Sequence, residues 1–139
     1  MKPAPCEKKD RARLVWIWVV GISFVVAGTN HFANPEPYLA MMPGYLLWPH
    51  ALVQISGIAE ILGGVGFLFH GTRPAAAWGL IALLVAVFPA NLNVALHGWP
   101  GIDVPRWIFW ARLPLQLLFL WWVYRIGNAN SNRPKNARD

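Results

Sequence analysis

Six polar side chains lie inside or at the ends of long apolar segments, and their types allow them to bind a ligand. They are Asn30, His31, Glu60, Asn91, Arg112 and Gln116. A charged side chain in the apolar interior of a membrane costs roughly 2.5 to 3.5 kcal/mol, so it faces other protein groups there. Amide, imidazole, carboxylate and guanidinium groups together offer both hydrogen-bond donors and acceptors. We expect these residues either to bind a polar head group or to hold neighbouring helices in register.

Glu60 lies near the middle of an apolar segment and should therefore face the inside of a helix bundle. Small residues lie three or four positions away from it: Ser56, Gly57, Gly63 and Gly64. Such a face lets a second helix approach closely. Arg112 is the cation that could pair with Glu60, and we expect an ion pair between them. Pro89 and Pro114 should kink their helices beside the polar residues and open a cavity.

The elements that position these residues are four apolar segments. The chain is 56% hydrophobic and only 13% charged, which is unusual for a soluble domain. We predict an all-α membrane protein, an antiparallel bundle of four transmembrane helices at about residues 14–32, 51–69, 74–95 and 107–124. The segment between the first two, residues 33–50, is rich in proline and aromatic residues, so we expect a loop at the membrane surface rather than a span.

The basic residues predict the orientation of the bundle. Ten of the 12 lysines and arginines lie in a head (1–13), in the turn before the third helix and in a tail (125–139), whereas Arg106 lies alone on the other side. Positive residues remain in the cytoplasm, so both termini are expected there and the chain in the plasma (inner) membrane. The polar tail is expected to be disordered. Because the net charge of +6 comes from the termini, we expect no nucleic-acid partner.

Several kinds of redox and metal site lack the residues that they need. Cys6 is the only cysteine, which excludes a disulfide framework or a thiol pair within one chain. His31, His50 and His97 all fall near one end of the predicted bundle, but no spacing typical of metal ligands joins them, so we expect no metal site.

Four motifs in this order resemble those of the DoxX-like family of small four-helix membrane proteins. They are residues 28–32 (GTNHF), 55–64 (ISGIAEILGG), 88–91 (FPAN) and 112–116 (RLPLQ). The resemblance extends over most of the chain, and it includes Glu60, Asn91, Arg112 and Gln116.

The resemblance implies a membrane subunit associated with an oxidoreductase system, with a quinone as the implied ligand or cofactor. A quinone or a lipid head group would then bind in the outer half of the bundle, and an enzyme partner would carry the electrons. No thiol pair or flavin motif supports catalysis by this chain alone. An alternative is a non-enzymatic assembly factor or chaperone for membrane proteins. A homo-oligomer stays open, and a transporter would require one because four helices seldom enclose a path.

Overall fold

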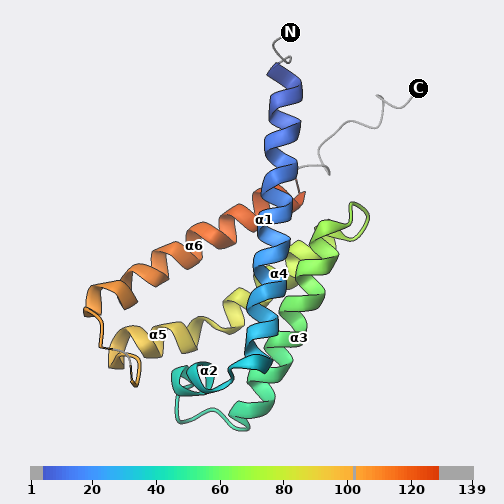
Figure 1. Cartoon of the computed structure of the whole chain (residues 1–139). Coiled ribbons are helices and arrows are strands. Elements are labelled where there is room, and N and C mark those ends of the chain that lie inside the picture. The colour runs from blue at the N-terminus through green and yellow to red at the C-terminus, as the bar shows by residue number, and fades with distance from the viewer. Residues whose placement is uncertain (1–4, 102, 129–139) are drawn as a thin grey trace.

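The computed structural model describes residues 5–101 and 103–128, with side chains from residue 11 onward. Every regular element in these residues is a helix (Figure 1). In chain order the helices are α1 (Pro5–Ala33), α2 (Glu36–Met41), α3 (Pro49–Leu68), α4 (Arg73–Ala86), α5 (Phe88–His97) and α6 (Arg106–Asn128). The predicted basic head falls partly, and the predicted disordered tail mostly, on residues outside the described part of the chain.

Three segments in the described part of the chain are long and apolar enough to cross a membrane: Arg11–Ala33, Pro49–Leu68 and Arg73–His97. The third of them consists of α4 and α5 together. The fourth predicted span corresponds to α6, in which Arg106, Arg112, Gln116 and Arg125 interrupt the apolar residues and lower the mean hydropathy.

The central contact of the fold joins α1 to α3, which run antiparallel side by side (Figure 1). Glycines allow this close approach. A methyl group added to Gly28 would lie 2.5 Å from the carbonyl oxygen of Gly57, and one added to Gly64 would lie 2.7 Å from the carbonyl oxygen of Gly21. In lipid, helices associate through such close packing rather than through the hydrophobic effect. Of the small-residue face predicted on the second span, Gly57 and Gly64 are therefore covered by α1, whereas Gly63 faces Leu80 of α4.

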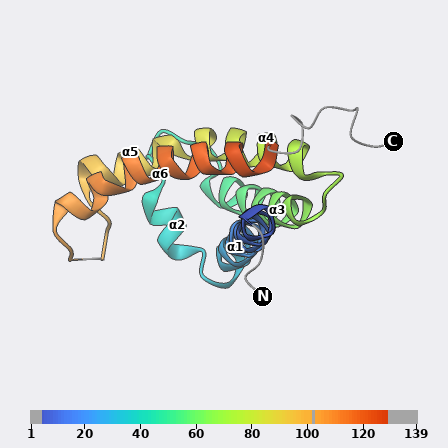
Figure 2. The same ribbon diagram turned by 90° about the horizontal axis from the view of Figure 1, so that it is seen from above.

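A break at Val87 divides the third predicted span, 74–95, into α4 and α5. Its physical cause is Pro89, which has no N–H group to donate to the carbonyl of Val85 and so interrupts the helix. Beside the break, the amide of Ala90 donates to the carbonyl oxygen of Val87, three residues back, and shares this acceptor with the amide of Asn91. Seen from above, α5 leads away from the α1 and α3 pair, with α6 running alongside it (Figure 2).

The C-terminal half of α6 contacts α1, and the N-terminal half of α6 diverges from α1 (Figure 1). Two aromatic pairs make this contact: Trp16 with Trp122, whose ring centroids are 4.5 Å apart, and Phe24 with Phe119, at 5.4 Å. Helices α1 and α6 therefore form a wedge that is narrow where α6 ends and wide where α6 begins. The short helix α2 packs against α3 and α5 in the wide part.

Two apolar clusters stabilise the ends of this wedge. The first joins α1, α3, α4 and α6 near the termini and includes Phe67, Leu80 and Val123. The second joins α2, α5 and α6 and includes Met41 and Phe109. Arg112 and Gln116 fall between Phe109 and Val123 along α6, so the fold leaves these two polar residues between two apolar layers.

We predict that Gly28→Ala lowers the free energy of unfolding by about 1 to 3 kcal/mol, because its methyl group must push α3 away. Thermal unfolding in detergent micelles measures this change. Gly79→Ala is the matched control, because its methyl group would meet nothing within 4 Å. Equal melting temperatures for the two variants would show that the α1 and α3 contact is looser than described.

Candidate functional site

Five of the six predicted residues line one cavity of about 330 Å³ in the wide part of the wedge. They are Asn30 and His31 from α1, Glu60 from α3, Asn91 from α5 and Arg112 from α6. Tyr38 and Met41 of α2 and Trp99 of the loop between α5 and α6 also line it. The break at Val87 contributes directly, because it carries α5 and the start of α6 away from α1.

His31 is buried and held in one orientation. Its Nδ1 lies 2.9 Å from the carbonyl oxygen of Val53 and 3.1 Å from Oγ of Ser56. A carbonyl oxygen only accepts hydrogen bonds, so Nδ1 carries the hydrogen and Nε2 is the atom left for the cavity. The ring of Tyr38 stacks on the other side, with centroids 3.8 Å apart. His31 is therefore a fixed part of the site rather than a residue at the rim of the bundle.

Glu60 faces His31 instead of Arg112, so the prediction of an ion pair between Glu60 and Arg112 is wrong. Its Oε2 lies 3.5 Å from Nε2 of His31. No carboxylate in the described part of the chain lies within 4.0 Å of the Arg112 guanidinium. The reason is geometric: the glycine contact brings α3 against α1, whereas the break at Val87 moves α6 away from both. The Oε2 atom of Glu60 is buried and accepts no hydrogen bond from a described residue.

Arg112 lies across the cavity with its guanidinium over the ring of Trp99, 4.8 Å from the ring centroid. The electron-rich face of a tryptophan attracts a cation at this distance. Its Nη1 is nevertheless buried without a hydrogen-bond acceptor among the described residues. Arg112 thus presents an unused donor to the cavity.

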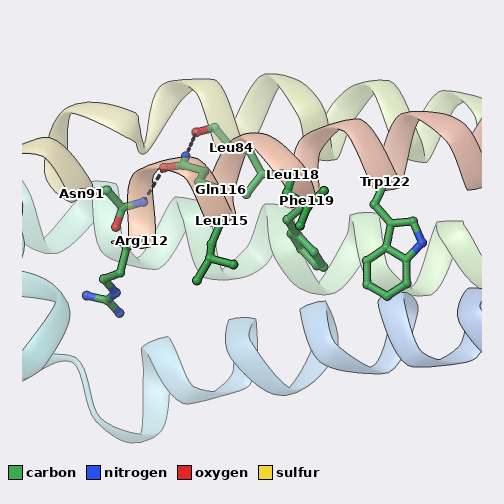
Figure 3. Close-up of a pocket in the computed structure, with 8 residues that line it drawn as sticks. All are labelled: Leu84, Asn91, Arg112, Leu115, Gln116, Leu118, Phe119 and Trp122. Carbon is green, nitrogen blue, oxygen red and sulfur yellow. Dashed lines mark hydrogen bonds between the residues drawn. The ribbon is translucent and has the colours of Figure 1, made fainter. Parts of the chain in front are cut away.

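Gln116 lies behind the cavity and connects α6 to both parts of the broken helix. Its Nε2 donates to the carbonyl oxygen of Leu84 at 2.6 Å, and its Oε1 accepts from Nδ2 of Asn91 at 2.9 Å (Figure 3). The Leu84 carbonyl lies just before the break, where no backbone N–H replaces this donor. Gln116 therefore positions Asn91 and has both ends of its own amide occupied.

A second hollow of about 500 Å³ adjoins the cavity along α6, and the two share Leu84, Asn91 and Arg112. Figure 3 shows Arg112 and Asn91 at one end of it and Phe119 and Trp122 at the other. The remaining lining is apolar: Leu115 and Leu118, with only Gln116 as a further polar residue. The polar cavity thus continues into an apolar groove.

Three site residues were not predicted as such: Tyr38, Ser56 and Trp99. The hydroxyl of Tyr38 accepts a hydrogen bond from Nδ2 of Asn30 at 2.8 Å. Pro35 and Pro37, which come just before Tyr38, were a usable signal, because they turn the chain back over the end of α1. Trp99 gave no such signal, since tryptophans at helix ends commonly anchor a protein at the membrane surface.

The two other histidines of the predicted set take no part in the cavity. His50 is exposed at the start of α3, and His97 is exposed with its Nδ1 3.1 Å from the backbone oxygen of Asn93. Within the part of the chain that the structure describes, no three His, Cys, Asp or Glu side chains are grouped so as to hold a metal ion.

We predict that Gln116→Met lowers the free energy of unfolding by about 1 to 3 kcal/mol, because it leaves the Leu84 carbonyl and the Asn91 amide without partners. The thermal unfolding midpoint in micelles reports the loss. Gln54→Met, at an exposed position of α3, serves as the control and should leave the midpoint unchanged. A Gln116→Met protein as stable as that control would refute the positioning role.

Comparison with known proteins shows the family to which the chain belongs. A search of curated proteins found no match, and a search of solved structures found none either. A family model described as "Domain of unknown function (DUF8561)" matches residues 20–127, which include every residue of the cavity and of the groove. The chain therefore belongs to the DUF8561 family.

Proposed function

We propose that this chain is a DoxX-like, four-span membrane subunit that binds the head group of a quinone, or of a lipid, in the cavity around Arg112 and Glu60. In this proposal it serves a membrane oxidoreductase system whose partner subunit carries the electrons. The proposal draws on the four motifs that resemble the DoxX-like family, all of which supply residues of the cavity.

One observation carries the proposal: two partly buried, ionisable side chains face the cavity from opposite sides, each with a buried atom that makes no hydrogen bond to a described residue. These atoms are Nη1 of Arg112 and Oε2 of Glu60. Native proteins seldom leave such atoms unsatisfied, because a buried charged group without a hydrogen bond is costly. A quinone head suits this arrangement because it is a flat ring with an oxygen at each end. Arg112 can only donate, so it would bind an oxygen acceptor.

The apolar groove supports a ligand with a tail. It begins at Arg112 and Asn91 and continues along Leu115 and Leu118. A head group bound at Arg112 could therefore extend an isoprenoid or acyl chain along α6 without leaving the protein surface. Both quinones and lipids have such chains, and a small soluble metabolite does not.

The fourth span and the orientation are part of the same proposal. Large apolar side chains cover the outer side of α6, among them Trp107, Leu117 and Trp121, each more than half exposed. Such a surface is suited to lipid rather than water. With α6 as a span, the basic residues of the head and tail lie together, which the positive-inside rule assigns to the cytoplasmic side of the inner membrane.

The alternative of an assembly factor or chaperone has less support. An assembly factor would offer both its small-residue helix face and its aromatic loop to client proteins. In this chain Gly57 and Gly64 pack against α1 and Tyr38 lines the cavity, so that of these features the exposed part is the end of the loop with Tyr45 and Trp48. We therefore retain no second function.

We predict that Arg112→Ala weakens the binding of a short-chain quinone roughly ten- to a hundredfold, which is the contribution of about 1.5 to 3 kcal/mol from one hydrogen bond to a charged donor. Titration calorimetry of the purified protein in detergent measures the dissociation constant. Arg106→Ala, an exposed position on the same helix, should bind as the natural chain does. Equal affinities for the two variants would contradict the proposed site, and displacement of the quinone by phospholipid alone would identify a lipid as its ligand.

The groove gives a separate prediction. Leu118→Trp should fill the groove and weaken binding of a long-chain quinone at least about tenfold, as expected from losing roughly two buried methylene groups. Affinity for the short-chain quinone should not change. Leu117→Trp is the matched control. Leu117 directly precedes Leu118 and is similarly exposed (61%, against 57% for Leu118), but it does not line the groove. The same measurement on both variants decides whether the tail lies there.

A further inference from the structure

The hydrogen bonds of His31 determine which protons the cavity can exchange. Nδ1 donates to the Val53 carbonyl, and Ser56 strengthens this arrangement because its own hydroxyl donates to the same carbonyl at 2.9 Å. The Oγ atom of Ser56 then has its lone pairs directed to Nδ1 of His31. Loss of the Nδ1 proton would break these contacts, so this proton stays on Nδ1.

The other nitrogen, Nε2, faces the carboxylate of Glu60 at 3.5 Å. Without a further proton, both groups are acceptors. One added proton can lie on either of them, as a neutral imidazole beside a carboxylic acid or as an imidazolium beside a carboxylate. The two side chains therefore act as one unit with a single exchangeable proton.

We propose that His31 and Glu60 share this proton, through a hydrogen bond, with an oxygen of the bound head group, so that the site distinguishes a quinone from its quinol. This inference rests on the proposed function. With the proton present, the pair donates to a quinone oxygen; with the proton absent, it accepts from a quinol hydroxyl. Arg112 cannot make this distinction because a guanidinium has donors and no acceptor.

The other groups that face the pair do not replace it. From α2, Tyr38 stacks on His31, and its hydroxyl is engaged by Asn30. From α6, Arg112 faces the cavity as a cation, and from α5 the facing polar residue is Asn91, an uncharged amide. Among the described residues that line the cavity, Glu60 is the carboxylate and His31 is the imidazole. A proton that the ligand shares in the cavity is therefore assigned to this pair.

The experiment compares a short-chain quinone and its quinol, titrated separately into the full-length protein at several pH values between about 5 and 8. The measured quantity is the dissociation constant of the quinone divided by that of the quinol. As the pH rises, the pair loses its proton, so quinone binding weakens and quinol binding strengthens. We expect the ratio to rise at least about tenfold, since a hydrogen bond to a charged group contributes about 1.5 to 3 kcal/mol.

Two substitutions, alone and together, test the assignment. Glu60→Gln keeps the size of the side chain but leaves His31 as the member of the pair that can hold the proton, so the pH dependence of the ratio should differ from that of the natural chain. His31→Asn keeps a donor near the Val53 carbonyl and removes Nε2, and the double variant of both changes has no place for the proton, so its ratio should be independent of pH. Glu36→Gln, on an exposed position of α2, should retain the pH dependence of the natural chain.

Each result has a definite meaning. A ratio that does not change with pH in the natural chain, although both ligands bind, overturns this inference and leaves the proposed function standing. A pH dependence that persists in the double variant of Glu60→Gln and His31→Asn also overturns it, because another group then holds the proton. Failure of both ligands to bind at any pH rejects the proposed function, and the inference with it.

Discussion

The contact between α1 and α3 through paired glycines is the interaction on which the rest of the structure depends. It brings the backbone of Gly28 against that of Gly57, closer than any side chain would permit. His31 lies one turn beyond Gly28, and this closeness is what lets its ring reach the Val53 carbonyl of the neighbouring helix. A wider spacing would separate His31 from Glu60 as well. The polar chemistry of the cavity is therefore a consequence of backbone packing between two otherwise apolar helices.

The break between α4 and α5 has the opposite effect, since it holds helices apart. Pro89 interrupts the hydrogen bonding, and Gln116 supplies a donor to the carbonyl of Leu84 beside the break. A broken helix inside a membrane is tolerated only when neighbouring groups satisfy its free carbonyls. Because Gln116 belongs to α6, the same bond that repairs the break also fixes α6 beside it. The cavity therefore has rigid walls although one of its helices is interrupted.

The sequence predicted much of this arrangement, and the differences have physical reasons. An all-helical chain with membrane-spanning segments follows from long apolar runs, and the cost of burying charge selected Glu60 and Arg112 as inward-facing residues. Their pairing was mispredicted because helix order fixes which residues share a depth but not how far two helices diverge. The role of Tyr38 was missed for a related reason: a proline-rich loop shows where a helix cannot run, but not the path by which the chain returns.

The separation of Glu60 from Arg112 bears on whether the polar residues bind a ligand or only hold helices together. Residues that serve packing alone are most stable when paired directly, because each partner then satisfies the other. In this cavity Arg112 rests on Trp99 and Glu60 lies beside His31, and each keeps an unpartnered buried atom. Such atoms reduce the stability of the empty fold. A geometry that keeps two opposite charges apart across a cavity therefore favours a ligand with a polar atom at each end over a purely structural role.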